Sequence, residues 1–367
     1  MAKKVAHLSS AHGRYDTRIF DKETRTLAEA GYDVHLVIAD GKPDELIHGV
    51  QIHNVSKKKP PRLQRILFTT FLVFLKARSL KADIYHFHDP ELLFTGFLLK
   101  FLGKKVIYDI HENTSLQIKT KTWIPRVIRG TISKSFSLIE HAACRLFDGL
   151  CVPQPSMKSH YSQLNDNTRL IANFVKMRLL EPFEPQDKTI IFHPGALSRN
   201  RGLFNMLDVL EHLDNVELVI AGAFESASVE EEAKAHRAWP KVRFLGYISQ
   251  NEVLEWYRRT NVGLILYDNI GQYYLSYAIK LFEYMERGIP VIMPDFGEWV
   301  DFNELNNCGL NVNVNDSTTT AAKIVALLQN PTAGKQMGQR GRKAIEQTYN
   351  WKVAGTELLD LYKVVTN

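Results

Sequence analysis

Short runs of mostly apolar residues recur along the whole chain and alternate with longer segments in which apolar residues return every three or four positions. Short, nearly uninterrupted runs are typical of strands that are buried on both faces of a parallel sheet. The longer periodic segments are typical of helices that cover such a sheet. The clearest runs lie at residues 5–8, 34–38, 83–87, 105–110, 189–192, 217–221, 242–247 and 262–266. The pattern therefore predicts an α/β fold with doubly wound sheets.

A proline-containing segment, residues 173–188, divides this pattern into two halves. The strand predicted directly after it begins a second series of alternating strands and helices. Because each half is long enough to bury a core of its own, we expect two domains, residues 1–175 and 176–350. Residues 351–367 continue with helical periodicity.

The loop that follows the first predicted strand holds the first candidate site residues. In doubly wound sheets, ligands bind where strands end and loops begin. His12, Gly13 and Arg14 are therefore placed to line a ligand cleft. Gly13 would let the backbone approach a ligand closely, although a simple turn glycine is the commoner explanation. The loop is not a Gly-x-Gly-x-x-Gly fingerprint, which argues against a nicotinamide cofactor.

Histidines gather at two further predicted strand ends. His86, His88, Asp89 and Glu91 accompany the third strand, and His111 follows the fourth. These side chains could ligate a metal ion, but a His-x-His pair without a well-spaced fourth ligand is weak evidence, so we expect no metal. A strand-end histidine is better placed to act on a substrate as a proton relay or a polar orienter, and a core histidine is the alternative.

Two arginines follow the first predicted strand of the second half. Arg199 and Arg201 lie in a loop bounded by glycines, where planar guanidinium groups suit phosphate oxygens. The alternative is an ordinary surface role for both. The chain contains no Asp-x-Asp pair, the usual carboxylate site for a metal-bound nucleotide.

The stretch from Tyr277 to Ile292 predicts a short helix that leads into a buried strand. Ser276, Lys280 and Glu283 are spaced by four and three residues and would share one face of this helix. A helix start with a cation one turn in suits a diphosphate, and the carboxylate could bind a sugar diol. The alternative is a solvated helix face with an ordinary Lys–Glu pair.

The charge of the chain is uneven. The net charge is +6, and the first 175 residues are the basic half at +10. Residues 57–81 hold eight basic residues and no acidic one around the apolar run 66–75, and residues 113–139 also lack acidic residues. This composition is typical of a segment that lies on anionic lipid, or of core helices with a basic rim. The apolar run is too short to span a bilayer.

The remaining composition indicates an ordinary globular protein, with 45% hydrophobic and 23% charged residues. Three cysteines without metal-type spacing suit a reducing compartment, and the first residues show no signal-peptide pattern. We therefore expect a cytoplasmic protein that can bind the inner face of the membrane. The basic stretches contain no recognised nucleic-acid-binding motif, so we expect no nucleic-acid partner.

In their order these pieces resemble the retaining glycosyltransferases of family 4, of the bacterial surface-polysaccharide type. The resemblance rests on the glycine loop after the first strand, His111 at a strand end, the loop 195–202 and the stretch 280–291. It covers essentially the whole chain and is most specific in the last motif. It implies the GT-B fold, in which two Rossmann-like domains face each other across a cleft, and a terminal helix at 351–367 that packs back on the N-terminal domain.

The resemblance also implies roles for individual residues. The C-terminal domain would bind a nucleotide sugar, with Glu283 on the ribose hydroxyls and with Arg201 and Lys280 on the diphosphate. His111 would lie near the transferred sugar, and Gly13 would let its loop approach the phosphates. The expected catalytic residues are thus His111, Arg201 and Lys280. The expected donor-binding residues are Gly13, Arg199, Arg201, Ser276, Lys280 and Glu283. The N-terminal domain would bind the acceptor, and the residues expected on that side are His12, Arg14, His88 and Asp89.

We therefore predict a metal-independent, hexosyltransferase-like enzyme without a cofactor. It would move a sugar from a nucleotide diphosphate to a hydroxyl of a saccharide or lipid-linked acceptor, with fixed positive charge to stabilise the leaving diphosphate. Two positions depart from the family pattern: Leu275 replaces a carboxylate and Ala196 replaces an arginine. Two alternatives remain open, a sugar-nucleotide epimerase on the same fold and a degenerate homologue that binds without catalysis.

Overall fold

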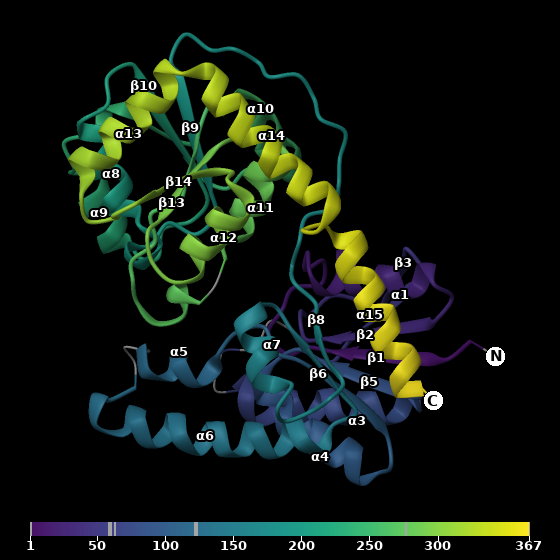
Figure 1. Ribbon diagram of the computed structural model, residues 1–367. Helices are drawn as coiled ribbons and strands as arrows, with labels where there is room; N and C mark the ends of the chain where they lie inside the picture. Colours follow the sequence, from purple (N-terminus) through teal and green to yellow (C-terminus); the bar gives the residue numbers. More distant parts are fainter. Residues whose placement is uncertain (1, 58–60, 62–63, 121–123, 276, 367) are drawn as a thin grey trace. The chain divides into compact units, whose positions relative to one another are not determined.

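The computed structural model describes residues 2–57, 61, 64–120, 124–275 and 277–366 (Figure 1). The chain forms two compact units. The first unit consists of residues 1–173 together with 351–367, and the second consists of residues 174–350. Each unit contains parallel strands with helices packed around them, as the alternation of apolar runs and periodic segments predicts.

The first unit is built on an eight-stranded sheet. Its strands are β1 (Lys4–Leu8), β2 (Asp33–Ile38), β3 (Glu45–Ile47), β4 (Val50–Asn54), β5 (Ile84–Phe87), β6 (Lys105–Asp109), β7 (Gly149–Val152) and β8 (Thr168–Leu170). They lie in the order β3-β4-β2-β1-β5-β6-β7-β8, and only the pair β3–β4 is antiparallel. The order of the strands reverses between β1 and β5. In open α/β sheets the crevice at such a reversal is where ligands bind, so the loops after β1 and β5 are the candidates in this unit.

Helices cover both faces of this sheet. They are η1 (Ile19–Thr24), α1 (Arg25–Glu29), η2 (Arg65–Thr69), α3 (Thr70–Leu80), η3 (Pro90–Leu92), α4 (Leu93–Phe101), α5 (Thr114–Thr120), α6 (Arg126–Leu146), α7 (Pro155–Tyr161) and α15 (Trp351–Thr366). Helix α15 joins the unit from far along the sequence (Figure 1). Its Trp351 indole N–H donates to the hydroxyl of Thr26 at 2.9 Å, and Leu358, Leu361 and Tyr362 are completely buried. Among the described residues, no helix is both long and apolar enough to cross a membrane.

The second unit has two three-stranded sheets that meet edge to edge. Its strands are β9 (Thr189–Pro194), β10 (Val216–Ala221), β11 (Val242–Phe244), β12 (Gly263–Leu264), β13 (Val291–Pro294) and β14 (Gly309–Val312). The sheets have the orders β11-β10-β9 and β12-β13-β14, and a parallel bridge between Ile191 and Val262 links β9 to the start of β12. The chain therefore reverses its direction of winding between β9 and β12. The loops after these two strands are the candidate ligand loops of this unit.

The helices of the second unit surround these strands. They are η4 (Arg199–Arg201), α8 (Leu203–Glu211), α9 (Ala227–Lys234), η5 (Trp239–Lys241), α10 (Gln250–Arg259), η6 (Gly271–Tyr274), α11 (Ile279–Glu286), α12 (Glu298–Asn306), α13 (Ser317–Gln329) and α14 (Pro331–Gln347). Helix α11 begins two residues later than the sequence predicts, because Ala278 is still extended at φ −76° and ψ 140°. It ends before Gly288, whose φ of +69° lies in the left-handed region.

Candidate active site

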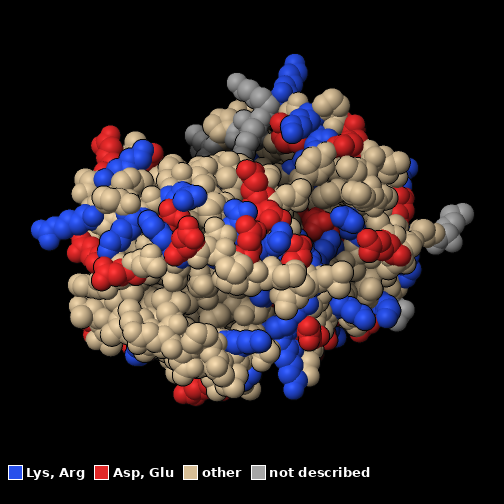
Figure 2. Space-filling view, turned by 90° about the horizontal axis from the view of Figure 1, so that it is seen from above, with Lys and Arg blue, Asp and Glu red and all other residues tan. Residues whose placement is uncertain are grey.

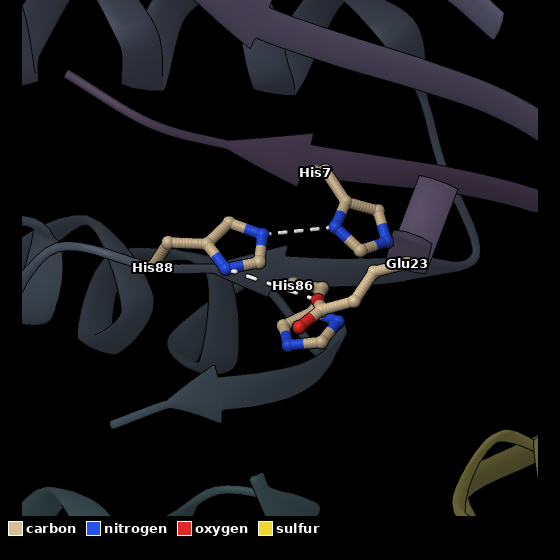
Figure 3. Close-up of side chains that lie close together, drawn as sticks. All are labelled: His7, Glu23, His86 and His88. Carbon is tan, nitrogen blue, oxygen red and sulfur yellow. Dashed lines mark hydrogen bonds and ion pairs between the residues drawn. The ribbon is translucent and has the colours of Figure 1, made fainter. Parts of the chain in front are cut away.

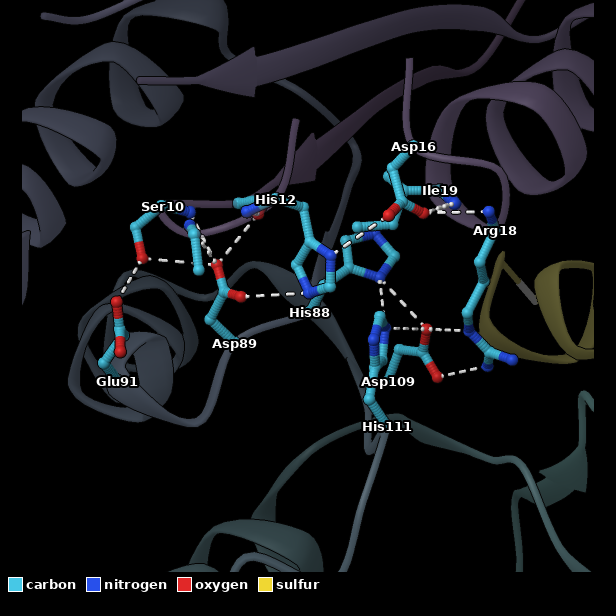
Figure 4. A network of polar contacts seen from close by, with 12 residues as sticks. Ser10, His12, Asp16, Arg18, Ile19, His88, Asp89, Glu91, Asp109 and His111 are labelled. Carbon is cyan, nitrogen blue, oxygen red and sulfur yellow. Dashed lines mark hydrogen bonds and ion pairs between the residues drawn. The ribbon is translucent and has the colours of Figure 1, made fainter. Parts of the chain in front are cut away.

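The loop after β1 is held in place by Asp89, which follows β5. One carboxylate oxygen, Oδ2, accepts hydrogen bonds from the backbone N–H of Ser10 at 2.6 Å and of Ala11 at 3.2 Å (Figure 4). The same oxygen accepts from the hydroxyl of Ser9 at 2.9 Å. Asp89 is only 2% exposed. Asp89 is expected on the acceptor side, but its Oδ2 oxygen accepts hydrogen bonds from the loop and so fixes the conformation of the loop.

His12 lies in that loop between two carboxylates. Its Nδ1 is 3.2 Å from Oδ2 of Asp16, and its Nε2 is 3.4 Å from Oδ1 of Asp89. Burial opposes protonation of the ring, but the hydrogen bond to Asp16 and the nearby carboxylates outweigh it and raise the pKa of His12. Its ring centroid lies 4.8 Å from that of His111. A partly exposed imidazole with increased basicity thus stands beside the expected catalytic histidine.

His111 is bound to Asp109 at the end of β6. The imidazole Nε2 lies 2.8 Å from Oδ2 of Asp109, and Nδ1 of His88 lies 3.0 Å from the same oxygen (Figure 4). Arg18 donates two hydrogen bonds to this carboxylate, from Nη2 to Oδ1 at 2.6 Å and from Nε to Oδ2 at 2.9 Å. Burial favours the neutral acid, yet Arg18 and His111 outweigh it and hold the pKa of Asp109 well below its usual range. The ionised carboxylate engages Nε2 of His111, so Nδ1 is the ring nitrogen that can face a ligand.

Behind this site lies a completely buried cluster of His7, His86, His88 and Glu23, whose side chains point toward one another (Figure 3). Nδ1 of His7 is 2.9 Å from Nε2 of His88. The hydroxyl of Tyr362 on α15 lies 3.1 Å from His7 and 2.9 Å from His86. Burial lowers the pKa of His7 and of His86 and lowers that of His88 to about 4. Burial also raises the pKa of Glu23. The cluster therefore holds three neutral imidazoles in the interior.

This cluster and a second group, His88, Asp109 and His111, have the residue types of a metal centre. Two contacts favour a hydrogen-bonded network instead. The Arg18 guanidinium lies 3.1 Å from Glu23, so a positive charge already occupies the carboxylate side. The imidazoles of His7 and His88 also bond to each other. Glu91, weighed as a ligand from the sequence, lies apart from this cluster, in contact with Arg65 and Ser10.

Arg14 lies in the same loop but is turned inward. It is 6% exposed and donates to Asp40 at 2.9 Å and 3.1 Å and to Glu45 at 2.9 Å. This guanidinium, expected on the acceptor side, fixes the base of the loop instead of presenting a free charge. The neighbouring Gly13 is exposed, and a Cβ built on it would meet no atom within 4 Å. The protein's own packing therefore does not require glycine at position 13.

In the second unit, the loop after β9 meets helix α11. Gly195 has a φ of +119°, and a Cβ built there would lie 3.4 Å from Nζ of Lys280. A Cβ on Gly222 would lie 2.0 Å from the carbonyl oxygen of Gly195, so both glycines are needed for this approach. Lys280 is 6% exposed, and its Nζ is 3.3 Å from the hydroxyl of Tyr267, after β12. The ammonium group thus lies at the winding reversal between β9 and β12, where the fold favours ligands.

His193 at the end of β9 belongs to the same cluster, although its place at a strand end is its only signal in the sequence. It is 1% exposed, and its Nδ1 lies 3.0 Å from the carbonyl oxygen of Leu264. Among the described residues, its Nε2 has no hydrogen-bond partner. Burial lowers the pKa of His193, and the charges of Lys280 and Arg201 lower it further. A neutral imidazole therefore lies within the electrostatic influence of two cations.

The remaining expected donor-site residues are placed as follows. Arg201 and Arg199 form the turn η4 that precedes α8. Arg199 is exposed, forms an ion pair with Glu232 and stacks over the Phe204 ring at 4.5 Å. Glu283 on α11 accepts a 2.7 Å hydrogen bond from the hydroxyl of Tyr257. The third residue expected on that helix face, Ser276, lies outside the described residues.

The site residues therefore form two clusters, one in each unit. Histidines and carboxylates meet at the strand reversal of the first unit, and Lys280 and His193 lie at that of the second, where the charge of Arg201 also acts. Two doubly wound α/β units, one with cations at the carboxyl ends of its strands, have the architecture of the GT-B class.

Comparison with known proteins supports the assignment to this class. Residues 18–178 match the family model "Glycosyltransferase Family 4", and residues 181–344 match "Glycosyl transferases group 1". N-acetyl-alpha-D-glucosaminyl L-malate synthase from Bacillus anthracis is 19% identical over 344 residues, which are 89% of this chain and 87% of that protein. The chain therefore belongs to the family 4 glycosyltransferases, and it is a transferase.

Solved structures show the same fold. Sucrose-phosphate synthase from Thermosynechococcus elongatus superimposes with a TM-score of 0.79 at 18% identity, with 98% of both chains covered. Anabaena HepE, solved with UDP and glucose, has a TM-score of 0.74 at 11% identity and covers 98% of this chain and 99% of its own. The GT-B fold expected from the sequence is confirmed, and the epimerase and non-catalytic alternatives are not favoured.

Proposed function

We propose that this glycosyltransferase takes its sugar from a nucleotide diphosphate sugar, with UDP as the first nucleotide to test. It transfers the sugar, with retention of configuration, to a hydroxyl of a saccharide or lipid-linked saccharide in polysaccharide or glycolipid assembly. The observation that carries the donor assignment is the close approach of Lys280 to the backbone at Gly195. A neighbour in fold that was solved with UDP and glucose supports the choice of nucleotide.

In this proposal the second unit holds the donor. Lys280 and Arg201 neutralise the diphosphate as it leaves, because fixed cations in a site shielded from water stabilise developing negative charge. These charges do the work that a metal ion does in other transferases, so the reaction needs neither a metal nor a cofactor. Glu283 accepts hydrogen bonds from the ribose, and Arg199 exchanges Glu232 for a phosphate oxygen. Ser276 stays a predicted donor contact.

The first unit then supplies the acceptor side. His111 directs Nδ1 toward the transferred sugar, and His12 presents a second polar group beside it. His88, Asp89 and Arg14 act as positioning residues, because their polar atoms already bond to protein groups. Gly13 leaves room for a phosphate or sugar at the loop, since its side is open.

We further propose that the first unit docks on anionic lipid. Helices α3, α4 and α6 pack in sequence, α3 on α4 and α4 on α6. They carry side chains that are large, apolar and each more than half exposed: Phe71, Phe94, Phe101, Val127 and Leu138. Such a concentration of exposed apolar side chains on one set of helices is typical of a surface that binds a partner or a membrane.

Charge favours lipid as the occupant of this surface. The three helices contain one acidic residue, Glu140, and it is only 2% exposed. The helices also carry basic residues, among them Arg126, Arg129 and Lys134 on α6. Basic and apolar side chains together, without competing carboxylates, suit the inner face of an anionic membrane. Residues 58–60, 62–63 and 121–123 of the two acid-free stretches lie outside the described residues.

A nucleic-acid partner is not part of the proposal. Figure 2 shows lysines and arginines interspersed with aspartates and glutamates over one face of the molecule. Nucleic-acid-binding surfaces instead gather a basic patch or stripe together with a recognised motif.

The donor assignment is tested by thermal unfolding with UDP-, GDP-, ADP- and dTDP-sugars. One nucleotide class should raise the melting temperature of the wild type, because a ligand that binds only the folded state stabilises it. Glu283→Ala should lose this shift, whereas Glu304→Ala, which removes an exposed carboxylate from α12, should keep it. No shift with any nucleotide sugar would overturn the assignment. Mass spectrometry of products from donor alone should show no isomerised sugar nucleotide.

The docking surface is tested by flotation with vesicles. Vesicles of phosphatidylglycerol should carry the wild type, and vesicles of phosphatidylcholine should carry less of it. The double variant Val127→Glu/Leu138→Glu should lose binding, because it places two carboxylates on the apolar face. Leu305→Glu, at an exposed apolar position in the second unit, is the matched control and should bind as the wild type does. Equal binding to both kinds of vesicle would contradict the role of charge.

A further inference from the structure

The second unit contains a cavity of about 590 Å³ that is separate from its cation cluster. It is lined by residues that precede β12 and β13, among them Val262 and Ile289, and by helix α14. These strands run parallel to each other, and β12 bridges in parallel to β9. The amino ends of β12 and β13 therefore lie at the opposite edge of the sheet from the carboxyl end of β9, where Lys280 and His193 meet. The cavity is a second site candidate and not an extension of the first.

Arg287 makes this cavity chemically unusual. It lines the cavity, is 9% exposed, and among the described residues its Nη1 has no hydrogen-bond partner. Its Nε lies 2.9 Å from Oε2 of Glu286, which is also in contact with Arg342. A buried guanidinium N–H without an acceptor is unfavourable, because its interaction with water is not replaced. A ligand oxygen at this point would remove that penalty.

The other charged groups around the cavity leave an excess of positive charge. Arg258 and Arg342 line it too, but Arg258 pairs with Glu181 and Arg342 pairs with Glu346, both cavity residues. Lys335 and Lys343 are exposed at its rim, and neither forms an ion pair with any residue that the structure describes. Nη1 of Arg287 and these two lysines are thus available to an anion, while Nε of Arg287 lies against Glu286.

The rest of the wall is apolar. Leu180 and Phe183 come from the segment that leads into β9, and Ile289 and Leu327 come from the unit itself. Pro290 and Pro331 also contribute carbon surface. A cavity with cationic side chains and an apolar wall suits an amphipathic molecule, that is, an anionic group attached to a hydrocarbon part.

Two contacts connect the cavity with the donor cluster. Arg287 directly follows α11, the helix that carries Lys280 and Glu283. Tyr257 lines the cavity, and its hydroxyl donates the 2.7 Å hydrogen bond to Glu283. A ligand that pulled on Arg287 or shifted the Tyr257 ring would therefore move or release groups that the donor uses. Such a differential interaction is the requirement for coupling between two sites.

We propose that this cavity binds the phosphate group of a small amphipathic molecule and that its occupancy changes the affinity of α11 for the nucleotide sugar. The coupling rests on the proposed function, whereas the binding itself does not. Phosphate meets Arg287 and the two lysines, because guanidinium and ammonium groups bind phosphate oxygens strongly. The apolar wall takes the hydrocarbon part.

The binding is tested by isothermal titration of the full chain with hexyl phosphate, inorganic phosphate and hexanol. Hexyl phosphate should bind, hexanol should not, and inorganic phosphate should bind more weakly than hexyl phosphate. Equal binding of inorganic phosphate would identify free phosphate as the ligand and would overturn the amphipathic part. Binding of hexanol as tight as that of hexyl phosphate, or no binding of any probe, would overturn the site.

Variants locate the binding. Lys335→Ala/Lys343→Ala should weaken hexyl phosphate at least several-fold, and these exposed positions should leave folding unchanged. Lys188→Ala, an exposed lysine of the same unit outside the cavity, is the matched control and should bind as the wild type does. Arg287→Met should abolish binding, and its melting temperature reports whether it folds. Unchanged binding in the double lysine variant and in a folded Arg287→Met would overturn the assignment.

The coupling is tested by measuring the dissociation constant for UDP with and without saturating hexyl phosphate. The constant should change several-fold in the wild type and not in Lys335→Ala/Lys343→Ala. If hexyl phosphate binds but UDP affinity stays constant, the regulatory role is overturned while the site stands. If hexyl phosphate binds and no nucleotide or nucleotide sugar does, the proposed function fails instead. The hexyl phosphate titration alone then decides whether the cavity is a binding site.

Discussion

The two units hold their candidate site residues in opposite ways. In the first unit His111 is the outer member of a buried network that continues through Asp109, His88 and His7 to Tyr362. In the second unit Lys280 lies against glycine backbone and one tyrosine hydroxyl, with few bonds to other site residues. The first unit thus connects its site to its interior through hydrogen bonds, whereas in the second unit the described contacts of Lys280 are with glycine backbone and one tyrosine. We expect changes to the first site to alter stability and activity together, and changes to the second to alter activity alone.

The largest expected effect is the response of the first unit to acid. Burial lowers the pKa of His7, His86 and His88, in the last case to about 4. The unfolded chain therefore binds more protons below pH 6.5, and the free energy of unfolding falls as pH decreases. Three such groups give a slope of up to about 4 kcal/mol per pH unit. Hydrogen exchange between pH 7 and pH 5 should show the first unit opening first; earlier opening of the second unit would contradict the comparison.

Removal of the charge of Asp109 should break the network at its centre. Asp109→Asn removes the carboxylate that accepts two hydrogen bonds from the buried Arg18 and leaves Glu23 as its remaining described carboxylate neighbour, which should lower the free energy of unfolding by about 3–5 kcal/mol. Activity should fall as well, because His111 loses the group that orients it. Urea unfolding and initial rates measure the two effects. Asp166→Asn, at an exposed position, is the control and should change neither. A stable but inactive Asp109→Asn would show that the network is separable from the fold.

Lys280→Met tests the second unit in the same way. Loss of a charge that acts on the leaving diphosphate should lower kcat by roughly 10²–10³-fold. The free energy of unfolding should change by less than about 1 kcal/mol, since Nζ has one weak hydrogen bond and methionine keeps most of the apolar stem. Lys188→Met controls for loss of a surface charge. If Lys280→Met unfolded the protein, the contrast between the units would be wrong.

The smallest effect is expected for Gly13→Ala. The site is open and its φ is not in the left-handed region, so alanine should stabilise the folded protein by about 0.4–1 kcal/mol. Activity should nevertheless fall, if substrate approaches the backbone there. Gly202→Ala is the counterpart in the second unit. Its Cβ would lie 1.9 Å from the carbonyl oxygen of Leu266 at a φ of +74°, so it should destabilise the protein. Unchanged activity in Gly13→Ala would remove this glycine from the site.

The strands could be predicted from the sequence because buried strands leave apolar runs that local pattern reveals. The cations of the second unit could also be found, since Arg201 and Lys280 lie just after a strand and at a helix start. The start of α11 was missed by two residues, because the extended conformation of Ala278 has no signal in composition.

The network of the first unit could not be predicted. His7 and Asp109 lie within strands, and Arg18 just before a helix, where each resembles an incidental polar residue. Their significance comes from pairing across the sheet. His7 and His88 are 81 residues apart in the sequence, and Arg18 and Asp109 are 91 residues apart. The place of its loop at a strand end predicts an acceptor-side role for Arg14, but Asp40 and Glu45 turn its charge inward. Contacts between residues so distant in sequence do not produce a periodic pattern, so local pattern cannot predict them.

Helix α15 gives this architecture a consequence during synthesis on the ribosome. Tyr362 meets His7 and His86 across a separation of 355 and 276 residues. While translation proceeds, the sheet of the first unit emerges early, yet its central histidines have no hydroxyl to bond until the whole second unit has been made. Because this helix follows the second unit in sequence, the polar network of the first unit can be completed only after the second unit has been synthesised.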